Sequence, residues 1–337
     1  MARNVFIDYL KGIAIFLVVW GHGIQYLDKE NNFYNNWLFL FIYSFHMPLF
    51  MCISGYLFAY SAKKRFYELF KSKMKQLIIP VLCWGVFFTL LVHHKQLEKL
   101  SLIGMLNNYF LLYLNDLPYH LWFLWSLFII SIIVSLLSTW RYNPLLLNGI
   151  FFLLLLCIPD YFGFSYVKFM YPFFLMGYIF NLNSCKLQKF KKNVVLASSI
   201  IFPICLLFWT KTDLIYVTKM SFYDAPFQSH LAIIYFRFLT GFTGVIACVN
   251  FIRKFLYFPN VKFITTMGVY SLGIYILQTL LYVVISKYSP VRGVNEYIYT
   301  FIFTSLVSVL VIIISISITK CIGKISSLSK LLFGGRY

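Results

Sequence analysis

Apolar residues fill long runs along most of the chain, from Val5 to Ile322. A helix needs about 17–25 mostly apolar residues to cross a bilayer, and windows of that length predict ten spans. They cover residues 5–27, 37–60, 76–92, 119–140, 145–159, 165–181, 194–210, 229–252, 263–286 and 297–322. Segment 101–114 is apolar but carries Asn107 and Asn108, so we expect an interfacial helix there, with an eleventh span as the alternative.

This pattern predicts an all-α integral membrane protein, a bundle of about ten transmembrane helices that forms a single domain over residues 1–337, without a separate soluble domain. Hydrophobic residues make up 61% of the chain and charged residues 12%, which leaves too little polar surface for a soluble protein of this length. The first 27 residues have the length of a signal peptide. Because Lys11 interrupts their apolar stretch and no small-x-small cleavage site follows Gly21, we expect a retained first span.

The charged residues between the spans predict the orientation. With the N-terminus inside, 19 of the 29 lysines and arginines fall in inside segments and seven in outside segments. Positive charge favours the cytoplasmic side, so we expect both termini in the cytoplasm. The net charge of +19 then reflects juxtamembrane clusters that attract anionic lipid. We expect membrane lipids as partners and no nucleic acid.

Ionisable residues within the first span are candidates for function, because inserting a charge costs roughly 2.5–3.5 kcal/mol near a helix centre. Lys11 and His22 are eleven residues apart, which puts them on the same helix face about 16 Å from each other. Asp8 precedes Lys11 by three residues and can pair with it. The alternatives are that Lys11 extends to the cytoplasmic interface and that His22 has a packing role.

His46 lies in the second span, within the sequence Phe-His-Met-Pro-Leu-Phe of residues 45–50. Pro48 lacks a backbone donor, so it would kink the helix and free a carbonyl near His46. A kink beside a purely structural histidine is the alternative. Arg237, His120 and Gln278 are expected in the outer half of the membrane as well, and we expect these groups to converge on one cavity.

Other polar residues carry simpler expectations. Lys168 is close to an interface, to which we expect its amine to extend, and we expect His93 and His94 in a solvated outside loop. Gly241 and Gly244 predict close helix contact. The seven cysteines show no metal spacing, and we expect neither a metal nor a bound cofactor.

Two motifs resemble the acyltransferase-3 family, whose members O-acylate bacterial surface glycans in the membrane. The opening, from Ile7 to His22, resembles the family's D-x-L-R-G-L-A … G-H signature, and residues 45–56 (FHMPLFMCISGY) are similar to its second-span pattern. Weaker similarities lie at residues 120–124, 173–178 and 270–275, so the resemblance runs through the chain in order. Lys11 stands where arginine is commoner. Gln278 stands where many relatives have histidine, so we assign it no proton transfer.

The resemblance implies a bacterial cytoplasmic (inner) membrane enzyme that moves an acyl group, by default acetyl, from cytoplasmic acyl-CoA to a hydroxyl of a surface or lipid-linked glycan. Acyl-CoA would be a co-substrate. The resemblance implies that His22 is the catalytic base and that His46 orients it or stabilises the oxyanion. Asp8 and Lys11 would bind the donor. Acceptor binding or oxyanion stabilisation would fall to Arg237, His120, Trp122 and Gln278.

Two other functions use the same buried groups. A glycan or lipid-linked-sugar transporter would bind its substrate with them, but the sequence shows no internal repeat and no paired broken helices. A glycan polymerase is disfavoured by the lack of a large extracytoplasmic loop.

Overall fold

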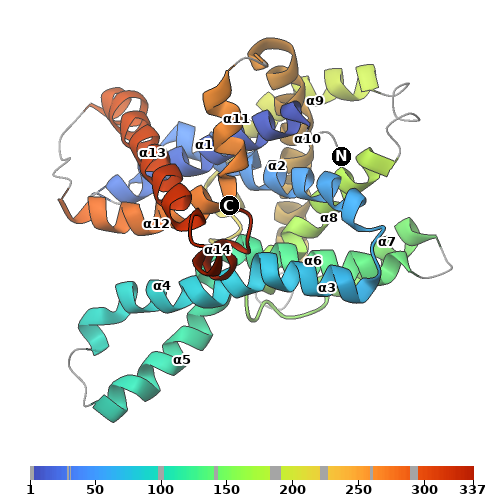
Figure 1. The fold of residues 1–337 in the computed structure, drawn as a ribbon. Coiled ribbons are helices and arrows are strands. Elements are labelled where there is room, and N and C mark those ends of the chain that lie inside the picture. Colours follow the sequence, from blue (N-terminus) through green and yellow to red (C-terminus); the bar gives the residue numbers. More distant parts are fainter. Residues whose placement is uncertain are drawn as a thin grey trace. The chain divides into compact units, whose positions relative to one another are not determined.

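A computed structural model describes residues 4–28, 30, 32–97, 102–139, 143–182, 191–220, 227–258, 261–288 and 295–337, and these contain helices and no strand (Figure 1). Seven of the lysines and arginines counted for the orientation lie outside the described residues, namely Arg3, Lys29, Lys99, Arg141, Lys186, Lys189 and Arg292. The α-helices are α1 (Val5–Leu27), α2 (Trp37–Ser61), α3 (Phe66–Lys73), α4 (Ile79–Leu97), α5 (Leu102–His120), α6 (Trp122–Ser138), α7 (Pro144–Leu156), α8 (Phe164–Leu182), α9 (Lys191–Phe208), α10 (Phe227–Phe251), α11 (Lys262–Val269), α12 (Ser271–Tyr288), α13 (Thr304–Gly323) and α14 (Ser326–Phe333).

Six helical segments in the described part of the chain are long and apolar enough to cross a membrane. They are Val5–Leu27, Trp37–Ser61, Phe66–Gln96, His230–Leu256, Ser271–Tyr288 and Ile298–Gly323. The all-helical class is therefore confirmed and a membrane bundle is supported, whereas the count of ten spans and the cytoplasmic termini stay predictions.

Three predicted spans differ from the helices in instructive ways. The window 119–140 begins at a bend of 72° between the helices Ile103–His120 and Trp122–Ser138. The window 263–286 is divided into α11 and α12. The window 145–159 contains only the 13 residues of α7. Hydropathy shows where apolar residues lie along the chain, but it does not show where a helix bends or ends.

The chain forms two compact units, which are described separately. Unit 1 comprises Met1–Ala59, Pro172–Met220 and Asp224–Thr319, and unit 2 comprises Tyr60–Tyr171, Ser221–Tyr223 and Lys320–Tyr337. The single domain predicted for residues 1–337 stays a prediction.

In unit 1, α1 packs against α11 with the two backbones in direct contact. A Cβ at Gly12 of α1 would overlap the carbonyl oxygen of Ile264, and one at Gly268 of α11 would overlap that of Asp8. Small residues allow this approach and are the usual basis of helix association in membranes. The contact fixes the half of α1 that carries Asp8 and Lys11.

The same arrangement joins α2 to α8, also in unit 1. A Cβ at Gly55 would overlap the carbonyl oxygen of Phe174, and one at Gly177 would overlap that of Cys52. These glycines belong to the motifs at 45–56 and 173–178, so part of each motif is explained by packing.

Close contact is confirmed for the two glycines of α10 as well. A Cβ at Gly241 would lie 2.5 Å from the ring of Phe173, and one at Gly244 would lie 2.7 Å from the ring of Phe202. An aromatic ring from a neighbouring helix therefore packs directly against each glycine.

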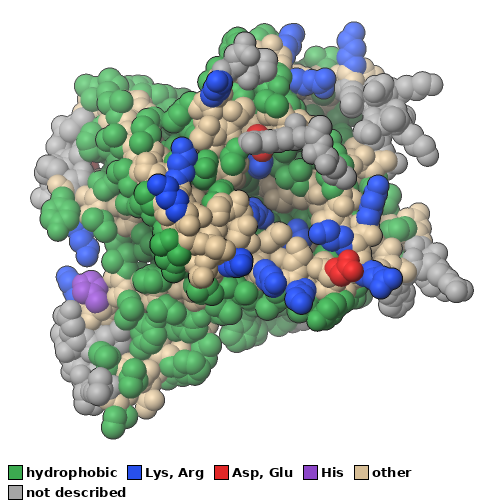
Figure 2. All heavy atoms as spheres, in the orientation of Figure 1, with side chains coloured by type: hydrophobic (Ala, Val, Ile, Leu, Met, Phe, Trp, Pro, Cys, Tyr) green, Lys and Arg blue, Asp and Glu red, His purple; other side chains and the backbone are tan. Residues whose placement is uncertain are grey.

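In unit 2, α4 and α5 run side by side as a hairpin (Figure 1). Tyr109 and Tyr113 of α5 donate hydrogen bonds to the carbonyls of Val86 (3.0 Å) and Leu82 (3.1 Å) of α4. Apolar side chains such as Phe110 remain exposed on this hairpin, and Figure 2 shows hydrophobic side chains over the part of the surface that α4 and α5 occupy. A hairpin with an apolar exterior suits a lipid environment.

Lys168 of α8 corrects one expectation from the sequence. Its side chain is fully buried in unit 2 and pairs with Asp160 at 2.7 Å, and it also donates to the carbonyl of Ile158. The prediction that its amine extends to the interface was wrong, because the segment before α8 supplies a buried carboxylate that neutralises the amine.

Candidate functional site

His22 lies on α1 in a small polar cluster with Gln25 and Tyr43. Its Nδ1 is 3.2 Å from Gln25 Oε1 and 3.3 Å from Tyr43 Oη. The Tyr43 hydroxyl in turn donates to Gln25 Oε1 at 3.2 Å. The three side chains thus form a triangle of contacts that leaves the other ring nitrogen, Nε2, outside it.

The ring of Tyr43 is held tightly between α1 and its own helix α2. A Cβ at Gly21 would lie 2.8 Å from Tyr43 Cε2, so only glycine leaves room for the ring at that position. The ring stacks on Phe39, with centroids 4.0 Å apart, and contacts His46 edge-on at 4.7 Å. Tyr43 therefore contacts both histidines of the predicted site.

His46 is buried on α2, with 2% of its surface exposed. Its Nδ1 is 2.6 Å from the carbonyl oxygen of Ile42, and since a carbonyl only accepts, Nδ1 carries the proton. The carbonyl that Pro48 leaves without its usual helical donor is that of Ser44, four residues earlier. The histidine therefore bonds to a different carbonyl from the one that the proline frees.

Asp8 and Lys11 form the ion pair that their spacing predicts. Lys11 Nζ lies 2.7 Å from Asp8 Oδ1, and both side chains are largely shielded from solvent. The pair lies on the half of α1 that packs against α11.

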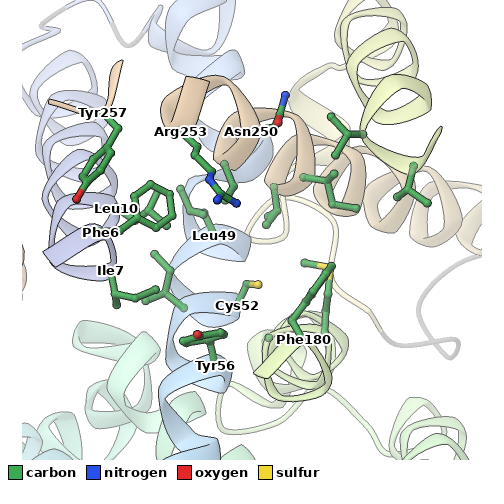
Figure 3. Close-up of a pocket in the computed structure, with 18 of the residues that line it drawn as sticks. Phe6, Ile7, Leu10, Leu49, Cys52, Tyr56, Phe180, Asn250, Arg253 and Tyr257 are labelled. Atoms are coloured by element: carbon green, nitrogen blue, oxygen red, sulfur yellow. The ribbon is translucent and has the colours of Figure 1, made fainter. Parts of the chain in front are cut away.

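A cavity of about 910 Å³ lies in unit 1 (Figure 3). Its described walls come from the N-terminal ends of α1 and α9 and the C-terminal parts of α2, α8 and α10. Most of the lining is apolar, including Leu10, Leu49 and Phe180. Arg253, from the π-helical turn Ile252–Leu256 that follows α10, directs its guanidinium into the cavity, and Lys192 of α9 adds a second cation.

The predicted donor-binding residues lie beside this cavity. Ile7 and Leu10 line it, whereas their neighbours Asp8 and Lys11 are not among its described lining residues. Arg253 and Lys192 are the cations among its described lining residues, and the charge pattern of the sequence had suggested for both only a role in setting the orientation.

Arg237 of α10 is fully buried and directs its guanidinium to a neighbouring segment of unit 1. It donates to the backbone carbonyls of Asp213 (2.7 Å) and Thr218 (2.9 Å), and Nη2 lies 3.5 Å from that of Thr212. These contacts hold the segment 212–218 against α10. Its predicted role toward the acceptor stays a prediction, and the carbonyl contacts give Arg237 a structural function of its own.

Gln278 of α12 is buried, with 1% of its surface exposed. Neither of its amide atoms has a hydrogen-bond partner among the described residues. An unpaired buried amide costs roughly 1–3 kcal/mol, so this side chain is suited to a polar ligand.

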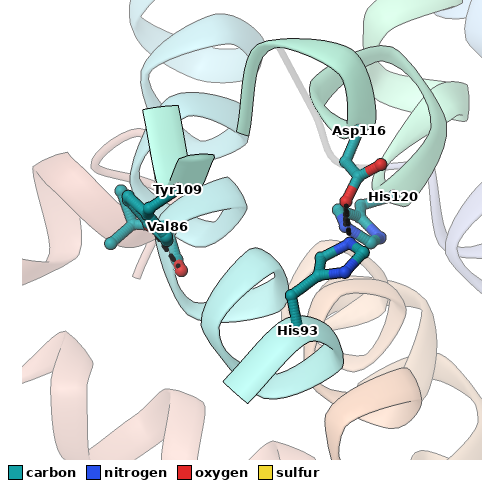
Figure 4. Close-up of polar contacts among 5 residues, drawn as sticks. All are labelled: Val86, His93, Tyr109, Asp116 and His120. Carbon is teal, nitrogen blue, oxygen red and sulfur yellow. Dashed lines mark hydrogen bonds and ion pairs between the residues drawn. The ribbon is translucent and has the colours of Figure 1, made fainter. Parts of the chain in front are cut away.

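His120 and Trp122 belong to unit 2, at the bend between α5 and α6. Asp116 lies between two histidines, with Oδ2 2.8 Å from His93 Nε2 and 3.4 Å from His120 Nε2 (Figure 4). Trp122 stacks on Tyr166, with ring centroids 4.5 Å apart. The expectation that His93 and His94 lie in a loop was wrong, because both are part of α4, where their side chains are partly exposed.

The structure thus brings together some of the predicted residues. His22 and His46 meet through Tyr43, and Asp8 meets Lys11. Sequence reasoning missed Gln25, Tyr43 and Arg253. A signal existed for the first two, since each lies three residues from a histidine and therefore on the same helix face.

Comparison with known proteins identifies the family. A family model described as an acyltransferase domain, that of the acyltransferase-3 family, matches residues 4–320. The chain belongs to the acyltransferase-3 family. The match includes every predicted site residue, whether it belongs to unit 1 or to unit 2.

Two curated relatives share the name nodulation protein NolL. The protein from Mesorhizobium japonicum is 29% identical over 230 residues, which cover 66% of this chain and 61% of the relative. The protein from Sinorhizobium fredii is 27% identical over 237 residues, which cover 66% of this chain and 62% of the relative. The matched part is thus about three fifths of each relative's length. No solved structure matches the chain.

Proposed function

We propose that this acyltransferase-3 protein transfers an acyl group, by default acetyl, from cytoplasmic acyl-CoA to a hydroxyl of a surface or lipid-linked glycan. It would act in the bacterial inner membrane with both termini in the cytoplasm. The cavity of unit 1 is the observation that carries the proposal, because its position and chemistry suit such a donor.

The position of the cavity agrees with the predicted orientation. The five helix ends that line it belong to segments that the charge distribution puts on the cytoplasmic side. Acyl-CoA made in the cytoplasm would reach the cavity without crossing the membrane.

The chemistry of the cavity suits a long ligand with an anionic end. Its volume of about 910 Å³ falls within the roughly 300–1,000 Å³ of small-molecule sites. The apolar walls fit a pantetheine arm and an acyl chain, and Arg253 and Lys192 can bind phosphate groups by charge-assisted hydrogen bonds.

The reaction needs a base, because a sugar hydroxyl is a weak nucleophile at neutral pH. His22 would accept the hydroxyl proton through Nε2 while the oxygen attacks the thioester carbonyl. Collapse of the intermediate would break the carbon–sulfur bond, and the imidazolium would return its proton to the leaving thiolate. The separation of about 16 Å between Lys11 and His22 on an ideal helix is comparable to an extended pantetheine arm.

His46 would accept a hydrogen bond from the acceptor in this scheme. With its Nδ1 proton committed to Ile42, a neutral His46 has only a lone pair at Nε2 and cannot donate to an oxyanion. Orienting the acceptor hydroxyl therefore fits His46 better than oxyanion stabilisation. Gln278, with its unpaired amide, is a better candidate for donating a hydrogen bond to a sugar oxygen or to the oxyanion.

A transfer assay tests the proposal. Purified protein receives radiolabelled acetyl-CoA and isolated surface glycan, and the wild type should label the glycan whereas His22→Ala should not. If glycan crosses vesicles without acyl-CoA and no label is transferred, the protein is a transporter and the proposal is wrong.

A second pair of variants tests the cavity. Arg253→Met should raise KM for acetyl-CoA at least about tenfold, the loss expected from one charge-assisted contact of 1.5 kcal/mol or more, with kcat little changed. Lys254→Met is the matched control, since it removes a neighbouring charge outside the described lining. Equal KM values for the two variants would place the donor elsewhere.

A further inference from the structure

We infer that Gln25 and Tyr43 are positioning residues that hold His22 in the tautomer protonated at Nδ1, so that Nε2 is free to accept a proton. The inference rests on the proposed function for its meaning, because a base at Nε2 matters only if His22 serves the transfer reaction. Its structural part stands on the contacts of the three side chains.

With Gln25 Oε1 facing His22 Nδ1, the count of protons in the triangle favours the tautomer protonated at Nδ1. Gln25 Oε1 is an acceptor only, and it lies 3.2 Å both from His22 Nδ1 and from Tyr43 Oη. An Nδ1–H on His22 and the hydroxyl of Tyr43 each supply one proton, so both contacts become hydrogen bonds. The Nδ1–H lies also within 3.3 Å of Tyr43 Oη, which can accept a share of it.

The other tautomer leaves one contact without a proton. If Nδ1 were bare, it would face Gln25 Oε1 at 3.2 Å as one acceptor against another. The single proton of Tyr43 could then serve His22 or Gln25 but not both. A cluster of partly buried polar atoms is most stable when each contact joins a donor to an acceptor.

Reversal of the Gln25 amide is the one arrangement that gives the opposite result. Its NH₂ would then donate to a bare Nδ1, and the proton of His22 would lie on Nε2. Oxygen and nitrogen of an amide are assigned from their partners, so a substitution that separates the two cases is needed. Gln25→Glu supplies it, because a carboxylate of nearly the same shape accepts and cannot donate.

Tyr43 gives the arrangement its rigidity. Its ring fills the space beside Gly21 and stacks on Phe39, so the position of the hydroxyl relative to His22 is fixed. Tyr43→Phe keeps that ring and removes only the hydroxyl, which separates positioning from packing. The arrangement is analogous to catalytic triads, where the partner of the second ring nitrogen sets tautomer and orientation of the base, with a neutral amide in place of the carboxylate.

The experiment combines spectroscopy with transfer rates. The full-length protein is labelled with ¹⁵N-histidine, and the signals of His22 among the six histidines are identified by their loss in His22→Gln. We expect Nδ1–H for His22 in the wild type and in Gln25→Glu, and a mixture of tautomers in Gln25→Leu. Because the signal does not require turnover, it tests the tautomer even if no acyl transfer is found.

The rates complete the test. In metal sites, loss of the group that orients a ligating histidine typically costs about 10–100-fold. We expect a fall in kcat of the same order in Gln25→Leu and a smaller one in Tyr43→Phe, with both KM values little changed. Gln25→Glu should recover most of the rate. An Nε2–H signal for His22 in the wild type, or a Gln25→Glu protein as slow as Gln25→Leu, overturns the inference.

Discussion

The ring of Tyr43 on α2 fills the space that a side chain at Gly21 of α1 would need, since Tyr43 Cε2 lies only 2.8 Å from an ideal Cβ at Gly21. The residue next to Gly21 is His22, whose contacts with Tyr43 and Gln25 depend on this fit. The glycine of the Gly-His pair therefore determines where the partner of the histidine lies.

Gly21→Ala should displace Tyr43 and lower the transfer rate. A methyl group there is closer to a ring atom than packed carbon atoms allow, and overpacking of this kind costs about 1–3 kcal/mol. We expect at least a tenfold fall in kcat, measured with the glycan-labelling assay. Gly149→Ala is the control, because a Cβ at that position meets no atom within 4 Å. Similar rates for the two variants would contradict the fit described here.

Gly55→Ala and Gly177→Ala should both destabilise the protein more than Gly21→Ala does. The added carbon would meet a backbone carbonyl of the facing helix in each case, and a backbone cannot rotate away as a side chain can. We expect a loss of at least about 2 kcal/mol, seen as a lower unfolding temperature in detergent. Unchanged unfolding temperatures would show that α2 and α8 are not in backbone contact.

Lys168→Met should destabilise unit 2 by roughly 3–5 kcal/mol, because the Asp160 carboxylate is left buried without its cation. The double variant Asp160→Asn with Lys168→Met should recover much of that loss. Thermal unfolding in detergent measures both, and Lys71→Met, at an exposed position of α3, controls for the loss of a charge. A single variant as stable as the control would contradict the buried pair.

Arg237→Met should loosen the segment 212–218, whose carbonyls lose their donors. Hydrogen exchange of the backbone amides in that segment should rise, and the protein should unfold at a lower temperature. Arg237→Lys should not restore either property, since one ammonium group cannot reach carbonyls that a planar guanidinium bridges. A role in acceptor binding predicts something different, namely a raised KM for the glycan with unchanged exchange.

Lys64→Cys should be inaccessible to a membrane-impermeant thiol reagent added outside intact cells, and accessible after the membrane is opened. The residue lies between α2 and α3, in a segment that the charge distribution assigns to the cytoplasm. The exposed Cys157 and Cys321 are first changed to serine. Labelling from outside would contradict the predicted orientation. The proposed entry of acyl-CoA to the cavity from the cytoplasm would then be wrong as well.

Local relationships were predictable from the sequence. Asp8 and Lys11 are three residues apart on one helix, so their contact follows from helix geometry alone. The glycines of α10 indicated close packing because a residue without a side chain inside an apolar span has few other uses.

Relationships between helices were not predictable. Tyr43 faces His22 because of how α1 and α2 are rotated about their axes, and apolar runs carry little information on rotation. Lys168 was mistaken for an interfacial lysine because its partner, Asp160, lies in an irregular segment whose course no periodicity reveals. Arg253 was counted among charges that set orientation, since only the folded chain shows that a cavity lies in front of it.

The backbone contact between α2 and α8 also determines how the cavity can be re-engineered. Both helices form walls of the cavity, through Cys52 and Tyr56 on one side and Met176 and Phe180 on the other. Because α2 and α8 are in backbone contact at Gly55 and Gly177, the two helices cannot separate to accommodate a larger ligand. The shape of the cavity is therefore fixed by the backbone. Its capacity is then adjusted by trimming individual side chains such as Met176 or Phe180, while the frame that holds them is left alone.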